Sequence, residues 1–233
     1  MRLLALLTAL ALALQGCTIA TGPAGAPAAA ARPVPQAGAA DIERFRTVAA
    51  RIEPVAERIC RERARSPNCD FRIVIDDRPG LPPNAYQSLD KDGRPVLAFT
   101  LSILADVENA DQLAFVMSHE AAHHVAGHIP RQQQNAMTGA ILLGGLASLS
   151  GAGSSAVDAA VDLGASVGAR SYSKDYELEA DAIGTVIAHR AGFDPVRGAA
   201  YFTRIADPGD RFLGTHPPNT RRIETVRRVA AGL

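Results

Sequence analysis

"LAFVMSHEAAHHVAGHIP", residues 113–130, is the stretch that decides the fold, because it carries four of the six histidines of this 233-residue chain. Asn109 stands where a helix N-cap is expected, and Pro130 is predicted to mark the far end of the same helix. His119 and His123 are four residues apart, so on a helix their directions differ by only about 40°. The stretch therefore predicts a helix that turns two imidazoles toward one point.

The sequence of that helix, His119-Glu120-x-x-His123, is typical of a zinc site. Two neutral imidazoles that converge suit Zn²⁺, which takes nitrogen ligands in a tetrahedral arrangement. Glu120 lies one step around the helix, where its carboxylate can take a proton from water held on the metal. The pattern predicts a hydrolytic metal site but leaves the third protein ligand open.

Two residues compete for the position of third ligand. His128 is near in sequence, but on a continuing helix it would lie about 180° from His119 and face away. The other candidate is Glu177 in "ELEAD", residues 177–181. There a second helix would present Glu177 to the metal and Asp181 to the second N–H of a ligating imidazole. We expect Glu177 to be the ligand. The remaining histidines are expected to be packing or surface residues: His124, His128 and His189.

The N-terminal residues predict a secreted and lipidated protein. Residues 1–16 combine one positive charge with an apolar run too short to span a bilayer, which indicates a signal peptide. The "LQGC" that ends at Cys17 resembles the lipobox of bacterial lipoproteins, in which this cysteine becomes the lipidated N-terminus. An ordinary cleaved signal with an incidental cysteine is the alternative. Residues 17–40, rich in Ala, Gly and Pro, predict a flexible tether, and residues 41–233 a single domain.

Cys60 and Cys69 are the only cysteines besides the lipidation candidate. Because the signal directs the chain to an oxidising compartment, we expect them to form a disulfide. Two buried free thiols are the alternative, since sequence alone supplies no Cα separation.

Around the histidine helix the sequence predicts an α+β domain. An Asp-Gly turn at 92–93 predicts a hairpin, and the three expected strands would form a small sheet beside the active-site helix. Residues 136–169 favour two closely packed helices, with a membrane- or substrate-contacting surface as the alternative. The expected elements are a helix from Asp41, strands at 71–75, 85–89 and 95–100, a helix from Ser173 to a stop at Gly192, one from Pro195, and a last one capped by Asn219 or Thr220.

Several motifs together resemble the HtpX and CAAX-prenyl-protease type of zinc metallopeptidases, especially its short periplasmic lipoprotein members. They are "PNAY", "PVLAFT", "DQLAFVMSHEAAHHVAGH", "YSKDYELEADAIG" and "THPPNTRRI", and they run in order through residues 41–233. The resemblance implies a zincin-like (gluzincin) fold that is mostly helical. It also implies the site: His119, His123 and Glu177 as zinc ligands, Glu120 as base, Asp181 as the acidic partner, and His216 as a gate or a transition-state aid. A plain surface histidine is the alternative for His216.

Taken together, these features predict a zinc-dependent endopeptidase of the bacterial periplasm, lipid-anchored, with the outer membrane as the expected location. The resemblance implies unfolded or misassembled outer-membrane proteins as substrates. The strand before the active-site helix, 95–100, is expected to bind them by strand addition. Lys+Arg and Asp+Glu are equal at 24 each, so no nucleic-acid partner is expected. A non-catalytic chaperone that uses the same groove and a structural lipoprotein with incidental zinc are the alternatives.

Overall fold

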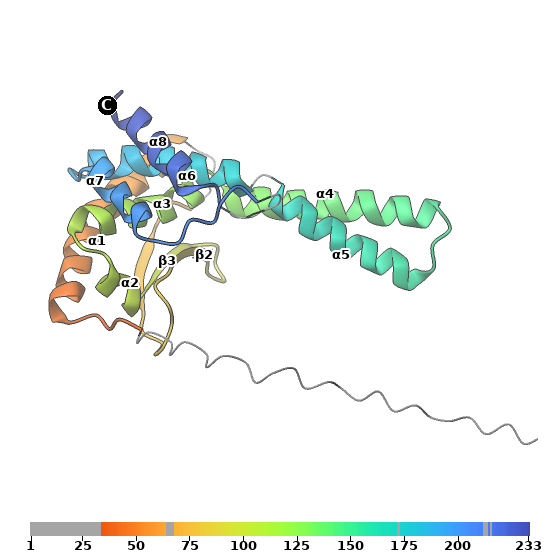
Figure 1. The fold of residues 1–233 in the computed structure, drawn as a ribbon, viewed down its shortest axis with the longest axis horizontal. Coiled ribbons are helices and arrows are strands. Elements are labelled where there is room, and N and C mark those ends of the chain that lie inside the picture. Colours follow the sequence, from red (N-terminus) through yellow and green to blue (C-terminus); the bar gives the residue numbers. More distant parts are fainter. Residues whose placement is uncertain (1–33, 64–67, 172, 212–213, 215) are drawn as a thin grey trace, which may run out of the picture. The chain divides into compact units, whose positions relative to one another are not determined.

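The computed structural model describes residues 34–63, 68–171, 173–211, 214 and 216–233 (Figure 1). The predicted signal peptide, Cys17 and most of the predicted tether lie outside the described residues. The first described helix, α1 (Ala39–Arg63), begins two residues earlier than the predicted start at Asp41 and so includes the last two residues of the predicted tether. It continues past Pro54 and turns one apolar face inward, formed by Phe45, Val48, Ile52, Val55, Ala56 and Ile59.

The strands form a three-stranded mixed sheet in the order β1-β3-β2. Their bounds are Arg72–Asp76, Ala85–Leu89 and Pro95–Thr100. The predicted hairpin is confirmed, because β2 and β3 pair antiparallel, whereas β1 pairs parallel with β3. Gly93, with φ of 75°, supplies the left-handed residue of the turn.

The strand order contradicts the prediction that the strand at 95–100 binds substrate by strand addition. The strand at 95–100 is β3, which lies in the centre of the sheet with a partner strand on each side. It therefore has no free edge to offer. Within the described part of the chain, β2 is the edge strand nearest to α3, with which it is in contact.

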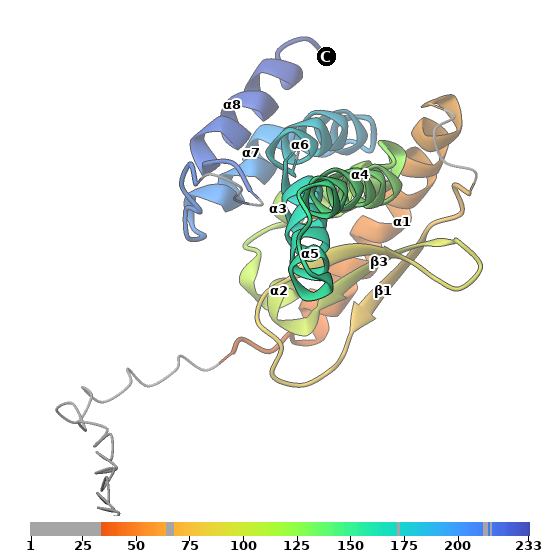
Figure 2. The same cartoon turned by 90° about the vertical axis from the view of Figure 1, so that its right-hand side faces the viewer.

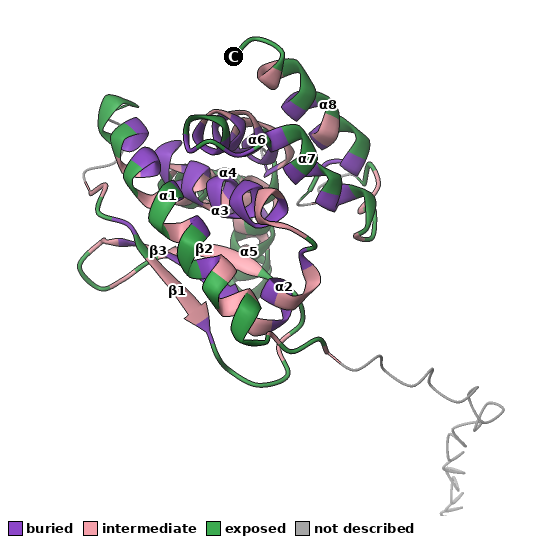
Figure 3. Ribbon diagram, turned by 90° about the vertical axis from the view of Figure 1, so that its left-hand side faces the viewer, coloured by how far each residue is buried: buried purple, intermediate pink, exposed green. Residues whose placement is uncertain are grey.

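The central helix, α3 (Ala110–Val125), is almost entirely buried (Figure 3). As predicted, the Asn109 side chain caps it by accepting a hydrogen bond from the backbone N–H of Gln112, at 3.0 Å. It contacts α1, β2, β3 and two later helices, α6 (Ser173–Arg190) and α7 (Pro195–Ala199). A short helix that the sequence did not predict, α2 (Leu101–Asp106), leads into it.

The far end of α3 differs from the prediction. The helix ends at Val125, and Gly127 adopts a left-handed conformation with φ of 67°, which L-residues with a side chain avoid. A new helix, α4 (His128–Leu149), starts at once. Pro130 therefore lies in the first turn of α4, where a missing N–H is tolerated, instead of marking the end of α3.

Helices α4 and α5 (Ser154–Arg170) form a hairpin, as the small and apolar composition of 136–169 predicted (Figures 1 and 2). Their backbones come close enough that a Cβ added to Gly139 would lie 2.0 Å from the carbonyl oxygen of Gly164. The outer surface keeps large apolar side chains exposed: Met137, Ile141, Leu142, Leu146, Leu149, Val161 and Leu163. Among the described helices, none has the length and apolarity that a membrane crossing requires.

The C-terminal part, residues 173–233, packs against α3 through α6 and α7. Helix α6 lies along α3 and also contacts α8 (Asn219–Ala230), and a 3-10 turn, η1 (Ala200–Thr203), follows α7. Gly192, with φ of 80°, follows α6 as predicted. Asn219 is the first residue of α8, but its side chain donates to the carbonyl oxygen of Phe202, at 2.9 Å, instead of capping the helix. The fold is thus α+β and mostly helical, as predicted.

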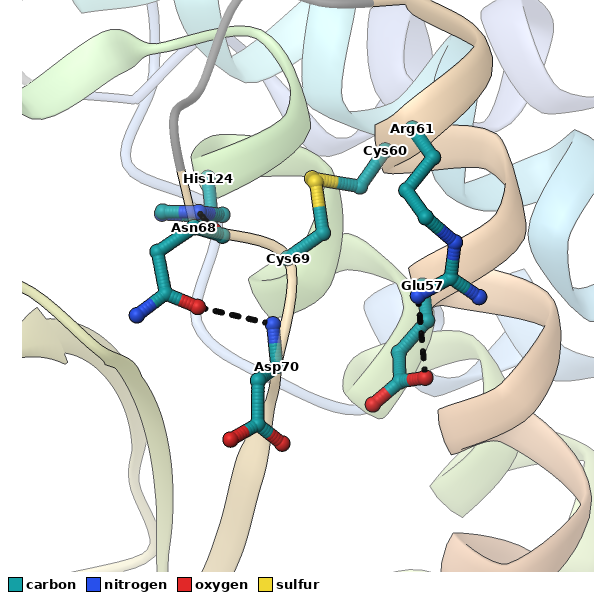
Figure 4. The surroundings of a disulfide bond; sticks show 7 residues. All are labelled: Glu57, Cys60, Arg61, Asn68, Cys69, Asp70 and His124. Atoms are coloured by element: carbon teal, nitrogen blue, oxygen red, sulfur yellow. Dashed lines mark hydrogen bonds and ion pairs between the residues drawn. A yellow bond between two sulfur atoms is a disulfide. The ribbon is translucent and has the colours of Figure 1, made fainter.

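A disulfide joins the end of α1 to the segment that leads into β1 (Figure 4). Cys60 and Cys69 have Cα atoms 5.7 Å apart, which lies in the usual range for a disulfide. Figure 4 also shows His124 of α3 beside Asn68, whose backbone oxygen lies 2.6 Å from Nε2 of the imidazole. The disulfide therefore lies next to the face of α3 that carries His124.

Candidate metal centre

The α3 helix turns His119 and His123 toward one point. Their Nε2 atoms are 3.0 Å apart, and the ring centroids are separated by 4.7 Å. Most of each side chain is covered by the fold, with 9% of His119 and 18% of His123 exposed. The spacing of four residues thus produces the convergence that the sequence predicted.

Glu177 reaches the same point from α6. Its carboxylate oxygens lie 3.4 Å from Nε2 of His119 and 3.4 Å from Nε2 of His123. One ligand atom from each of the three residues falls within 4.8 Å of the other two. Two imidazoles and a carboxylate on one side of a common centre make a three-ligand set, with room left for a fourth, exchangeable position.

The donors fit a zinc ion. The Oε2 atom of Glu177 is buried and makes no hydrogen bond of good geometry in the described part of the chain, because its nearest donors, Nε2 of His119 and Nη2 of Arg222, lie 3.4 Å away. A cation at the point where the three side chains converge would satisfy this oxygen. Burial and the neighbouring His119 lower the pKa of His123 to about 3, so that imidazole is neutral and can act as a ligand. Although burial opposes it, His119 and His123 hold the pKa of Glu177 well below its usual range, so the carboxylate is ionised.

The second nitrogen of His119 meets Asp181, as the sequence predicted. Nδ1 of His119 lies 2.9 Å from Oδ1 of Asp181, a carboxylate with no exposed surface. Although burial and Arg222 oppose it, Asp181 and Glu177 raise the pKa of His119 to about 9. The same two carboxylates therefore favour positive charge at this place, whether on a ring or on a metal.

Arg222 of α8 is a part of the site that the sequence interpretation missed. Its Nε and Nη2 donate to the two carboxylate oxygens of Asp181, at 2.8 and 2.7 Å, and Nη2 lies 3.4 Å from Oε2 of Glu177. The signal was present in the sequence. On the amphipathic last helix, Arg222 shares the buried face with Thr225 and Val226, where an unpaired cation is not tolerated.

Glu120 lies beside the convergent ligands and faces β2. Burial raises the pKa of Glu120 to about 7, and repulsion from the Glu177 carboxylate acts in the same direction. The backbone of Gln87 on β2 hydrogen-bonds to the carboxylate. A carboxylate with a pKa near neutrality is suited to accept a proton and then to return it.

A cavity of about 380 Å³ opens over these groups. It is lined on one side by the edge strand β2 and its preceding residue, over 84–87, and on the other by the three candidate ligands and Glu120. His216 also lines it, with Nε2 at 3.8 Å from Oε2 of Glu177 and about half of its side chain exposed. The structure thus brings together the predicted ligands, the predicted base Glu120, the acidic partner Asp181 and His216.

Of the three histidines that were expected to be packing or surface residues, two lie away from the candidate metal centre and one contacts it. His189 is exposed and His124 is buried against Asn68, away from the convergent point. His128, however, does not face away: its Nδ1 lies 2.9 Å from Nδ1 of His123. The expectation that His128 faces away was wrong because α3 ends at Val125, and the left-handed Gly127 redirects the chain into α4.

Comparison with known proteins agrees with this geometry. The sequence profile of peptidase family M48 matches residues 44–230. The chain is 29% identical to the mitochondrial metalloendopeptidase OMA1 of Saccharomyces cerevisiae over 196 residues, which cover 76% of this chain and 54% of that protein. It is 32% identical to the beta-barrel assembly-enhancing protease of Escherichia coli O157:H7 over 145 residues, 53% of this chain and 28% of that one. The chain thus spans about half or less of the length of these relatives.

Proposed function

The chain belongs to peptidase family M48, and from this membership we propose that it is a zinc-dependent endopeptidase of the bacterial cell envelope. The observation that carries the proposal is the convergence of His119, His123 and Glu177 next to the carboxylate of Glu120, in the wall of one cavity. A pure binding protein would have no use for a base at that position.

The residues of the site have separate roles in the proposed hydrolysis. His119, His123 and Glu177 would hold the zinc ion, which supplies a Lewis acid that polarises the scissile carbonyl and eases the deprotonation of water. Glu120 takes the proton of the attacking water as the oxygen–carbon bond forms. It returns that proton to the leaving nitrogen as the carbon–nitrogen bond breaks.

The substrate is proposed to bind as an added strand on β2. This edge strand has no second partner among the described residues, and its residues line the same cavity as Glu120. Strand addition recognises the backbone more than the side chains, which suits extended, unfolded chains. The name of the beta-barrel assembly-enhancing proteases supports unfolded or misassembled outer-membrane proteins as the substrate class.

The site of action is proposed to be the periplasmic face of the outer membrane, with lipidated Cys17 as the anchor. The "LQGC" motif supports lipidation of Cys17. The next residue is Thr18, where an aspartate would favour retention in the inner membrane, so we propose the outer membrane as the location. We propose that, within the M48 family, the protein belongs with the short lipoprotein members of the HtpX and CAAX-prenyl-protease type. Mass spectrometry of the mature protein from membranes should show diacylated or triacylated Cys17, and an unmodified thiol would contradict the anchor.

Cleavage of casein and of an unfolded porin by the purified protein tests the activity. We expect wild type to cleave both, Glu120→Gln to lose cleavage by at least about 100-fold, since base catalysis contributes that much or more, and His189→Gln, at an exposed site, to match wild type. A chelator should abolish cleavage, and added zinc should restore it. Equal activity in wild type and Glu120→Gln would contradict the mechanism, and binding of unfolded porin without cleavage would favour a chaperone.

The role of His216 can be decided with the same assay. If His216 assists the reaction at the carbonyl oxygen, His216→Ala should lower kcat and leave KM nearly unchanged. If it closes the site as a gate, the same substitution should raise the rate of cleavage. A variant that matches wild type in both constants would leave His216 as a surface residue.

A further inference from the structure

The two candidate histidine ligands are supported in different ways. His119 presents its second nitrogen to a carboxylate, Asp181, which Arg222 holds in turn. His123 has no carboxylate at its second nitrogen in the described structure. Its Nδ1 lies instead 2.9 Å from Nδ1 of His128, the first residue of α4.

The contact between His123 and His128 continues to a carboxylate one step further out. Nε2 of His128 lies 3.2 Å from Oε2 of Glu179 on α6, and Nη1 of Arg131 donates to the same oxygen at 2.7 Å. The chain from His123 through His128 to Glu179 and Arg131 thus ends, like that of His119, on a carboxylate paired with an arginine.

The imidazole of His128 is held in a fixed orientation. Only 5% of its side chain is exposed, and its ring stacks on Tyr176, with centroids 4.6 Å apart and an interplanar angle of 14°. The guanidinium carbon of Arg131 lies 4.3 Å from the centroid of the Tyr176 ring, and Asn135 donates to the Tyr176 hydroxyl at 2.8 Å. Turning the His128 ring would therefore break its stacking on Tyr176 or its contacts with His123 and Glu179.

The hydrogen bonds that run from His123 through His128 to Glu179 have one consistent assignment of donors and acceptors. A histidine that ligates a metal through Nε2 carries its proton on Nδ1, so His123 donates to Nδ1 of His128. A neutral His128 then has its proton on Nε2 and donates it to Glu179. Each donor meets an acceptor, and the carboxylate at the end stays paired with Arg131.

We propose that His128 is a positioning residue of the metal centre, which, backed by Glu179, holds His123 in the tautomer and orientation that a zinc ligand needs. The inference rests on the proposed zinc site and extends it to a residue that is not itself one of the proposed metal ligands. A partner in this position usually raises metal affinity by about 10- to 100-fold.

Zinc affinity of the purified full chain, measured by competition with a chromophoric chelator, tests the proposal. His128→Leu should weaken zinc binding by about 10- to 100-fold. His128→Asn should recover part of this loss, because its amide oxygen can stand near the position of Nδ1. Replacing Glu179 by Leu should weaken binding less than His128→Leu, and the double variant should lose less than the sum of the two effects, because both act through one chain.

His124 offers a matched control. It is the neighbour of His123, is buried like His128, and makes its hydrogen bond to the backbone of Asn68 beside the disulfide (Figure 4). His124→Leu should therefore keep the zinc affinity of wild type. The visible spectrum of the cobalt-substituted protein adds a second readout, because it should change in His128→Leu and remain as in wild type in His124→Leu. Circular dichroism in the presence of chelator verifies that each variant is folded.

The outcomes separate this proposal from the proposed activity. A folded His128→Leu variant that binds zinc as tightly as wild type, with an unchanged cobalt spectrum, would overturn it. Equal losses in His124→Leu and His128→Leu would also overturn it, because they would reveal a general effect on the helix. A wild-type protein that binds zinc with the expected order among the variants, but cleaves no peptide, would contradict only the proposed endopeptidase activity.

Discussion

Gly184 of α6 lies directly against the backbone of His119. A Cβ added to Gly184 would lie 3.0 Å from the nitrogen and 3.1 Å from the Cα of His119. These are backbone atoms of a buried helix and cannot move aside as a flexible side chain can. Glu177 and Asp181 are on the same helix as Gly184, so this contact sets how far both carboxylates reach toward the imidazoles.

Replacing Gly184 by Ala should weaken the metal centre. The substitution forces α3 and α6 apart by a few tenths of an ångström, which lengthens the distances between His119 and both carboxylates. We expect lower zinc affinity, although alanine favours a helix by about 1 kcal/mol over glycine. Chelator competition measures the affinity. Gly145→Ala in α4, where the added Cβ would meet nothing within 4 Å, serves as a control, and an unchanged affinity in Gly184→Ala would contradict the prediction.

Replacing Arg222 by Met should destabilise the fold even without metal. The substitution keeps an apolar stem but leaves the carboxylate of Asp181 buried without its bidentate partner. Breaking a buried ion pair in this way typically costs roughly 3–5 kcal/mol. Urea unfolding in chelator measures the loss.

The adjacent Arg221 is exposed, so Arg221→Met should change the free energy of unfolding by less than about 0.5 kcal/mol. A double variant, Arg222→Met with Asp181→Leu, should lose less than the sum of the single losses, since it removes the orphaned charge. Additive losses would mean that Arg222 stabilises the fold through other contacts.

Asp76 should make the sheet that carries the edge strand sensitive to acid. Hydrogen bonds from Arg78, and one from the Tyr86 hydroxyl of β2 at 2.8 Å, hold the pKa of Asp76 well below its usual value near 3.8. A carboxyl whose pKa is lowered by folding stabilises the protein above its unfolded pKa. That contribution is lost as the pH falls below about 4 toward the folded pKa.

Asp76→Asn should therefore be less stable than wild type at pH 7, and the difference between the two should shrink as the pH falls from 4 toward 2. Urea unfolding at several pH values measures this difference. Asp77→Asn, at the neighbouring exposed position, is the matched control. A difference for Asp76→Asn that stays constant down to pH 2 would show that the carboxylate charge is not what stabilises the cluster.

The α4–α5 hairpin should depend on its glycines and not on the metal centre. Ala at Gly139 would drive a Cβ into the backbone of Gly164, so the hairpin should open. Hydrogen exchange over 136–170 should become faster, beyond the first turn of α4 that carries His128, while Gly145→Ala in the same helix should slow it or leave it unchanged. Zinc affinity should stay as in wild type for both variants, and loss of zinc binding in Gly139→Ala would show that the hairpin supports the site.

Much of the site followed from patterns that a few turns of helix determine. The four-residue spacing of His119 and His123 has one geometric consequence once a helix forms, and the capping side chain of Asn109 starts that helix. Glu177 and Asp181, also four residues apart, share a face for the same reason. The hairpin turn at Gly93 is likewise encoded locally.

The errors arose where one element meets another. His128 was expected to face away because the helix was extended past Gly127, whose left-handed conformation redirects the chain. The strand at 95–100 was expected to bind substrate, but its position between β1 and β2 depends on pairing over long sequence separations. Arg222 stands on the far side of Asp181, more than forty residues away, and no local pattern joins them.

The sequence by itself therefore determined most of the helices, the hairpin, and the pairs of residues that α3 and α6 present, because helical and strand periods depend on neighbouring residues only. The tertiary structure alone decided which groups complete the site: Arg222 behind Asp181, His128 behind His123 and β2 at the edge of the cavity. These choices depend on how close the backbones of α3 and α6 can come and on where α4 begins. Packing settles such distances over the whole domain at once.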